Sequence, residues 1–88
     1  MGVQKASGLL KPNIVAAVSA SASAIVLPGG GDLPNCIYIG ATGNPVLTVN
    51  GASITFNALA AGVWHPMPNF SHVTAAGGAT GIIVGRTE

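Results

Sequence analysis

Residues 46–56 read VLTVNGASITF, two runs of alternating apolar and polar residues joined by Asn50 and Gly51. An Asn-Gly pair between two such runs is the strongest short signal for a β-hairpin, because a type I′ turn requires positive φ at both central residues. A two-residue loop pairs the residues on either side of the turn. One face then carries the apolar set Leu47, Val49, Ala52, Ile54 and Phe56. Since a slip by one residue would destroy this agreement, the sequence predicts the register as well as the hairpin.

Other short apolar runs, bounded by glycine and proline, lie on both sides of the hairpin. They span residues 36–39, 63–65, 73–75 and 82–84. Turn signals recur about every 8–12 residues, which is typical of a sandwich or barrel. Proline removes hydrogen-bond donors from a strand, so Pro66 predicts an edge strand or an irregular crossing at residues 63–65. We therefore expect an all-β fold, a small antiparallel β-sandwich or barrel with an extended N-terminal arm.

A further strand is predicted within residues 14–27, where from Val18 onward small apolar residues alternate with serine. A period of two predicts a strand with one buried face, although alanine is a good helix former and a helix is the alternative. The apolar side of this strand would be Val18, Ala20, Ala22, Ala24 and Val26. Residues 1–13 show no period, so we divide the chain into an arm with the first strand (residues 1–27) and a small β domain (residues 28–88). A secretory signal is an alternative, but the apolar run at residues 14–18 is shorter than the usual minimum of about seven residues.

Charge is nearly absent from the middle of the chain. The 88 residues include three Lys or Arg and two Asp or Glu, and between Pro12 and Gly85 the one charged residue is Asp32. Ordinary soluble domains carry charge on about 25% of their residues. A chain this small buries only about 60–65% of its unfolded surface, and a single cysteine supplies no internal disulfide. We therefore expect surface to be hidden in a homo-oligomer, a trimer or pentamer, rather than covered by neutral polar groups.

The same composition argues against several classes of function. A net charge of +1 gives no footprint for nucleic acid, and no stretch approaches the ~20 apolar residues of a membrane span. Asp32 lies in a glycine-rich segment and is interpreted as a turn residue. Cys36 is interpreted as a buried thiol, with a Cys36–His65 nucleophile–base pair as the rival. His65 and His72 lack the spacing of a metal site. We expect no enzyme activity, no cofactor and no metal.

Four segments occur in an order that is similar to a known family. They are Tyr38-Ile39-Gly40, Ile54-Thr55-Phe56, Gly62 to Pro66, and Thr80-Gly81-Ile82-Ile83-Val84. This order over residues 34–85 resembles a family of small phage structural proteins that includes the head-spike base proteins of gene transfer agents. The resemblance implies a non-enzymatic component of a tailed-phage virion on the head surface, a capsid decoration or cement protein or a vertex spike-base subunit. Its implied partners are the major capsid protein or other virion proteins.

Docking by apolar burial is the mechanism that we expect for such a subunit. Aromatic residues and Met are enriched at interfaces, so Trp64, Met67 and Phe70 are predicted as anchors of an interface or of the end of the core. Lys5 and Lys11 in the arm would pair with acidic groups on the capsid or remain solvated. The alternative function is a small carbohydrate- or ligand-binding β domain, with Trp64, Tyr38 and His65 lining a site. A secreted surface-array subunit is a third option, and it requires the secretory signal.

Overall fold

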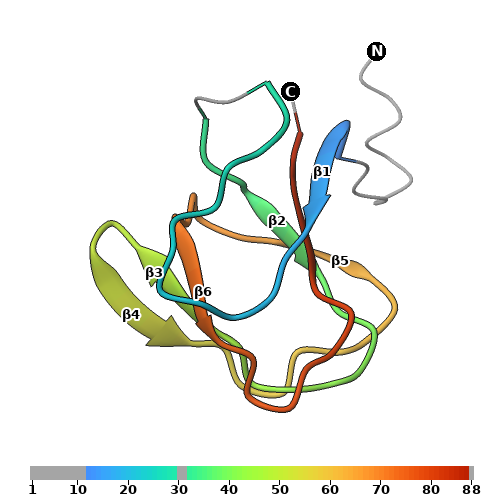
Figure 1. Cartoon of the computed structure of the whole chain (residues 1–88). Helices are drawn as coiled ribbons and strands as arrows, with labels where there is room; N and C mark the ends of the chain where they lie inside the picture. Colours follow the sequence, from blue (N-terminus) through green and yellow to red (C-terminus); the bar gives the residue numbers. More distant parts are fainter. Residues whose placement is uncertain (1–11, 30–31, 88) are drawn as a thin grey trace.

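Two antiparallel sheets enclose a single core in the computed structural model, which describes residues 12–29 and 32–87. The strands are β1 (Ile14–Ala17), β2 (Cys36–Tyr38), β3 (Val46–Val49), β4 (Ala52–Thr55), β5 (Trp64–Pro66), β6 (His72–Ala75) and β7 (Ile83–Arg86) (Figure 1). One sheet has four strands in the order β1-β7-β2-β5, and the other has three in the order β4-β3-β6. The described residues contain no helix, so the all-β prediction is confirmed.

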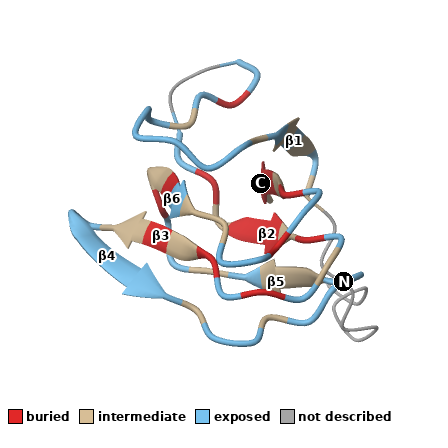
Figure 2. Cartoon of the chain, turned by 60° about the horizontal axis from the view of Figure 1, so that its bottom comes forward, coloured by how far each residue is buried: buried red, intermediate tan, exposed pale blue. Residues whose placement is uncertain are grey.

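The β3–β4 hairpin forms in the predicted register. Val49 lies opposite Ala52 and Leu47 lies opposite Ile54. The turn residues Asn50 and Gly51 have φ values of 54° and 84°, which is the pair of positive angles that a type I′ turn requires. Local turn chemistry and cross-strand patterning therefore agree on one structure. The prediction was incomplete in one respect: the whole of β4 is exposed, so its apolar face is not covered (Figure 2).

The strand predicted within residues 14–27 is confirmed only at Ile14–Ala17 (β1), and the alternating stretch from Val18 to Val26 is neither a strand nor a helix. Residues 18–27, here called the crossing segment, pass from the four-stranded sheet to the three-stranded one (Figure 1). The Val18 N–H donates to the Ile82 carbonyl (3.0 Å), whereas the N–H groups of Ser21 and Ile25 donate to carbonyls of Val73 (2.9 Å) and Ser71 (2.8 Å). A strand needs one continuous partner, but this segment changes partners after Val18.

The predicted apolar face of that segment also differs from the observed one. Ala20, Ala22, Ala24 and Val26 are exposed, and Val26 keeps 77% of its surface in contact with solvent. The crossing segment contributes Leu27, which is buried, together with the half-buried Val18 and Ile25. Alanine methyl groups bury too little area to decide which side faces the core, so the three larger side chains decide it.

The core lies between the two sheets. Ile37, Ile39 and Val84 enter it from the β2 and β7 region, and Leu47 and Val73 enter it from the three-stranded sheet. The buried set is Leu27, Ile37, Ile39, Leu47, Phe70, Val73, Ala79, Ile82 and Val84. Residues 12–27 are built into both sheets through β1 and the crossing segment, so they share this core with residues 32–87. Of the arm expected over residues 1–13, the part up to residue 11 lies outside the described residues.

Candidate functional site

The outward side of the four-stranded sheet is apolar, and its composition follows from strand register. Ile83 lies opposite both Ala17 and Tyr38, and Tyr38 lies opposite Trp64, so these four side chains form one row. Their sequence neighbours Ala16, Val84 and Ile37 point the other way, into the core. We call this outward side the outer face; its residues are Val15, Ala17, Cys36, Tyr38, Trp64, Pro66, Ile83 and Gly85.

No side chain of the outer face carries a charge at neutral pH. A sheet that packs against a core on one side normally presents polar residues on the other. Here Val15 is 45% exposed, and Tyr38, Trp64 and Ile83 are half-buried. The outer face is therefore apolar: Cys36 and Gly85 on it are buried, with the Pro12 side chain against Gly85, and its other residues are half-buried or exposed.

Tyr38 and Trp64 form the largest feature of the outer face. Their ring centroids lie 5.6 Å apart, and the ring planes are inclined at 51°. A tilted aromatic pair at this separation is worth about 0.5–1.5 kcal/mol beyond the area it buries. The two rings are therefore already ordered in the free protein, so less conformational entropy is lost when a partner binds them.

The nucleophile–base pair considered for Cys36 and His65 is not formed. Cys36 lies opposite Pro66, and His65 lies opposite Ile37, so the thiol and the imidazole are on opposite faces of the sheet. The His65 Nε2 is instead 2.8 Å from the Ala60 carbonyl oxygen. Burial raises the pKa of the Cys36 thiol, which disfavours the nucleophilic thiolate. The same register separates His65 from Tyr38 and Trp64, so the site expected for a ligand-binding domain is not brought together.

Three further polar side chains, those of His72, Asp32 and Arg86, contact other polar groups of the described residues. His72 Nδ1 lies 2.6 Å from the Ser71 hydroxyl. Asp32, predicted as a turn residue, lies at a bend, and its carboxylate is 3.5 Å from Nε of Arg86. Arg86 also donates from a terminal nitrogen to the Leu33 carbonyl (3.2 Å). Within residues 12–29 and 32–87, no three His, Cys, Asp or Glu side chains are grouped so that they could hold a metal ion.

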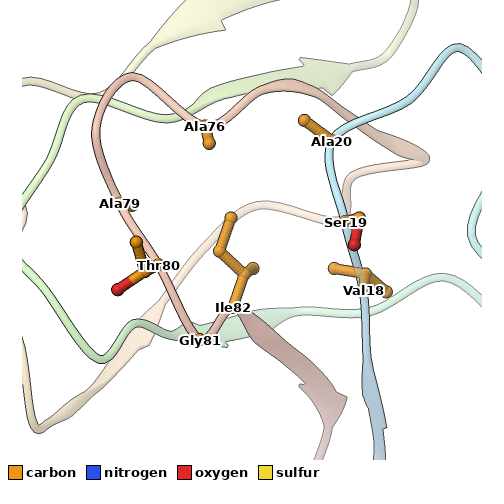
Figure 3. A pocket seen from close by; sticks show the side chains of 8 residues that line it. All are labelled: Val18, Ser19, Ala20, Ala76, Ala79, Thr80, Gly81 and Ile82. Atoms are coloured by element: carbon orange, nitrogen blue, oxygen red, sulfur yellow. The ribbon is translucent and has the colours of Figure 1, made fainter.

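A shallow hollow lies between the crossing segment and the turn before β7. Its volume is about 190 Å³, and Figure 3 shows Val18 and Ala20 on one side and Thr80 and Ile82 on the other. The full lining is Val18, Ser19, Ala20, Ala76, Ala79, Thr80, Gly81 and Ile82. The hydroxyls of Ser19 and Thr80 are its polar side-chain groups, so the hollow offers no acid, base or nucleophile activated by a partner.

The predicted interface residues separate into three groups. Trp64 lies on the outer face, as an interface anchor would. Met67 is half-buried against the core, and Phe70 is wholly buried in it, so of the two roles expected for Phe70 the structure has the core role. Lys5 and Lys11 lie outside the described residues. Sequence reasoning missed Val15 and Ile83 as surface residues, because each stands in an apolar run whose two faces could not be told apart.

Comparison of the chain with protein-family models, with curated proteins and with solved structures found no match. Among the described residues, no helix has the length and apolar character needed to cross a bilayer.

Proposed function

We propose that this chain is a non-enzymatic structural protein of a tailed-phage virion, a capsid decoration or cement protein or a vertex spike-base subunit on the head surface. The observation that carries this proposal is the uncharged outer face with its Tyr38–Trp64 pair. A sheet that packs one face against its own core and leaves an uncharged apolar row partly exposed on the other has a surface suited to a partner. The order of motifs resembles that of small phage structural proteins. This resemblance indicates the partner: the major capsid protein, another virion protein or sister copies.

Burial of the outer face is the proposed mechanism of attachment. Apolar surface removed from water contributes about 25 cal/mol per Å², and a preformed aromatic pair adds area at little entropic cost. A particle that displays many equivalent docking positions converts weak single contacts into stable attachment of an oligomer. No proton transfer or covalent step is needed for this role.

The test uses particles assembled without this chain, mixed with the purified protein and separated by sedimentation. Trp64→Ala should lower the affinity for particles at least about tenfold, because a central Trp is a common hot spot. Val26→Ala is the matched control: Val26 is exposed but lies on the crossing segment, so binding should change by less than about twofold. Thermal unfolding of both variants checks that they are folded. If the wild-type chain fails to bind particles and is missing from purified virions by mass spectrometry, the proposal is wrong.

The carbohydrate- or ligand-binding alternative has one observation in its favour, the half-buried aromatic pair on the outer face. Rings inclined at 51° do not form one flat platform for a sugar, and His65 is on the other face. Titration of the Trp64 fluorescence with a panel of glycans tests this alternative; a saturable change at micromolar ligand would favour it over assembly.

A further inference from the structure

We propose that β4 is a self-pairing edge: two copies of this chain join their β4 strands antiparallel about a twofold axis centred on Ile54, which makes a continuous sheet β6-β3-β4-β4-β3-β6. This inference deepens the self-association part of the proposed function and rests on it. It concerns a different surface from the outer face, which lies on the other sheet.

The edge of β4 lacks the features that normally prevent strands from pairing with other molecules. Natural edges carry charge, proline, a bulge or a covering segment. The outer edge of β6 is covered by the crossing segment through Ser21 and Ile25, and the edge strand β5 contains Pro66. β4 reads Ala-Ser-Ile-Thr, is exposed along its whole length, and pairs with β3 without a break in register. Figure 2 shows it as an exposed strand at the margin of the molecule.

The hairpin geometry fixes which backbone groups point outward. In a hairpin with a two-residue loop, the residues flanking the turn exchange hydrogen bonds, and such pairs alternate along the ladder. Ala52 and Ile54 therefore bond to β3, and the Phe56 N–H continues the series by donating to the Pro45 carbonyl (2.9 Å). The N–H and C=O groups of Ser53 and Thr55 point away from β3, and among the described residues they meet no backbone partner there.

A second copy of β4 fits these groups without a mismatch. With Ile54 on the twofold axis, Ser53 of each copy lies opposite Thr55 of the other, and both pairs exchange backbone hydrogen bonds. Ile54 then meets Ile54 in a close, non-hydrogen-bonded pair, and Ala52 lies opposite Phe56 on the same face. Apolar residues thus meet apolar ones and hydroxyls meet hydroxyls. Since residues 33–85 contain no Asp, Glu, Lys or Arg, bringing two hairpins together creates no charge repulsion.

The register centred on Ile54 is favoured over registers shifted by one residue, because it pairs all the outward N–H and C=O groups of Ser53 and Thr55. If the axis is moved to Ser53, Thr55 of each strand lies opposite a turn residue. If it is moved to Thr55, Ser53 of each strand lies opposite a loop residue. Either shift also places Ile54 opposite a residue other than itself. A twofold contact repeats the same patch on both partners, so each complementary pair occurs twice.

Disulfide trapping tests the register directly. Ile54→Cys places two thiols in a non-hydrogen-bonded pair, where the Cα separation of about 4.5 Å suits a disulfide. Diamide as the oxidant should convert most of this variant to a covalent dimer on a non-reducing gel. Ser53→Cys is the matched control: it is on the same strand and equally exposed, but each copy lies opposite Thr55, so it should cross-link at least about tenfold more slowly. Wild type gives the background, since Cys36 is fully buried.

Three outcomes overturn the inference: faster cross-linking of Ser53→Cys than of Ile54→Cys, equal cross-linking of both, or no cross-linking of either at about 100 μM protein. Sedimentation velocity adds a second readout without cysteine. Ile54→Lys should raise the dimer dissociation constant at least tenfold, and Val63→Lys, an exposed apolar residue on the loop before β5, should not. These measurements need no particles, so failure of particle docking and failure of β4 pairing are separate results.

Discussion

Gly77 occupies a turn that accepts no side chain. Its φ is +59°, and a Cβ there would collide with the backbone carbonyl of Asn44, whereas Gly78 (φ +94°) has open space around it. Gly78→Ala should therefore destabilise the fold only through backbone strain, by about 1–2 kcal/mol. Gly77→Ala adds the collision and should lower the free energy of unfolding by about 3–5 kcal/mol. Urea denaturation of both variants measures the difference; equal losses would mean that the two turns do not approach each other.

Ala58 shows the opposite case, a residue with a side chain where glycine fits better. Its φ is 55°, and its N–H donates to Oδ1 of Asn44 (2.6 Å), which holds the turn in this conformation. Ala58→Gly removes about 1–2 kcal/mol of strain and adds up to about 1 kcal/mol of unfolded-state entropy. We expect a net stabilisation of about 0.5 kcal/mol in urea denaturation. Ala61→Gly, at an exposed alanine of ordinary φ, should destabilise instead.

The buried thiol of Cys36 should make the fold less stable as the pH rises into the alkaline range. Burial raises the pKa of its thiol, so the unfolded chain loses the proton at a lower pH than the folded one. Above about pH 8.5 the unfolded state binds fewer protons, and the free energy of unfolding falls as pH rises. Urea denaturation from pH 7 to pH 10 should show this decline. Cys36→Ala should be less stable at pH 7 but should decline less steeply; parallel curves for the two proteins would contradict the assignment.

At the level of elements, the β3–β4 hairpin has one covered arm and one uncovered arm. Leu47 and Ile54 lie opposite each other on the same face, yet Leu47 is fully buried and Ile54 is 39% exposed. Leu47→Ala should destabilise the chain by about 2–5 kcal/mol, and Ile54→Ala by about 1 kcal/mol or less. Denaturation at low micromolar protein, where self-association is minimal, measures both values. A large loss at Ile54 would contradict its exposed position on β4.

How far the sequence predicts each element depends on whether its partners are close along the chain. The hairpin was predictable to the residue, because Asn50 and Gly51 specify the turn and both arms agree on the register. The crossing segment was not, because its hydrogen-bond partners Ile82, Val73 and Ser71 are distant in sequence. Alternating Ala and Ser is compatible with a strand, a helix or an irregular path, so only tertiary contacts decide among them.

The candidate site was predictable only in part, for a related reason. Trp64 could be singled out by its size and rarity, but its neighbours on the outer face depend on the order β1-β7-β2-β5, which no local pattern contains. The Asp32–Arg86 contact likewise joins residues far apart in sequence. The exposed state of β4 could not be predicted either, because its alternation is the same whether or not another layer covers it.

At the scale of the whole molecule, the lack of charge determines how association should respond to salt. Contacts between charged groups weaken as the screening length falls from about 14 Å to about 4 Å between 0.05 and 0.5 M NaCl. Self-association through apolar surface and backbone hydrogen bonds should change less than about twofold over that range, and ammonium sulfate should strengthen it. Sedimentation equilibrium measures this response. A tenfold weakening by NaCl would point instead to charged residues such as Lys5 and Lys11.

The pairing of β1 with β7 has a consequence for biosynthesis. Ile14–Ala17 are translated well before the strand that they join, Ile83–Arg86. Until then the four-stranded sheet lacks its second strand, and the apolar residues of the early segment have no place to pack. Folding that depends on such distant contacts is slow, because closing a long loop costs entropy before any stabilising contact forms. We therefore expect a chain truncated before Ile83 to lack the partner strand of β1, to stay unfolded and to be prone to aggregation.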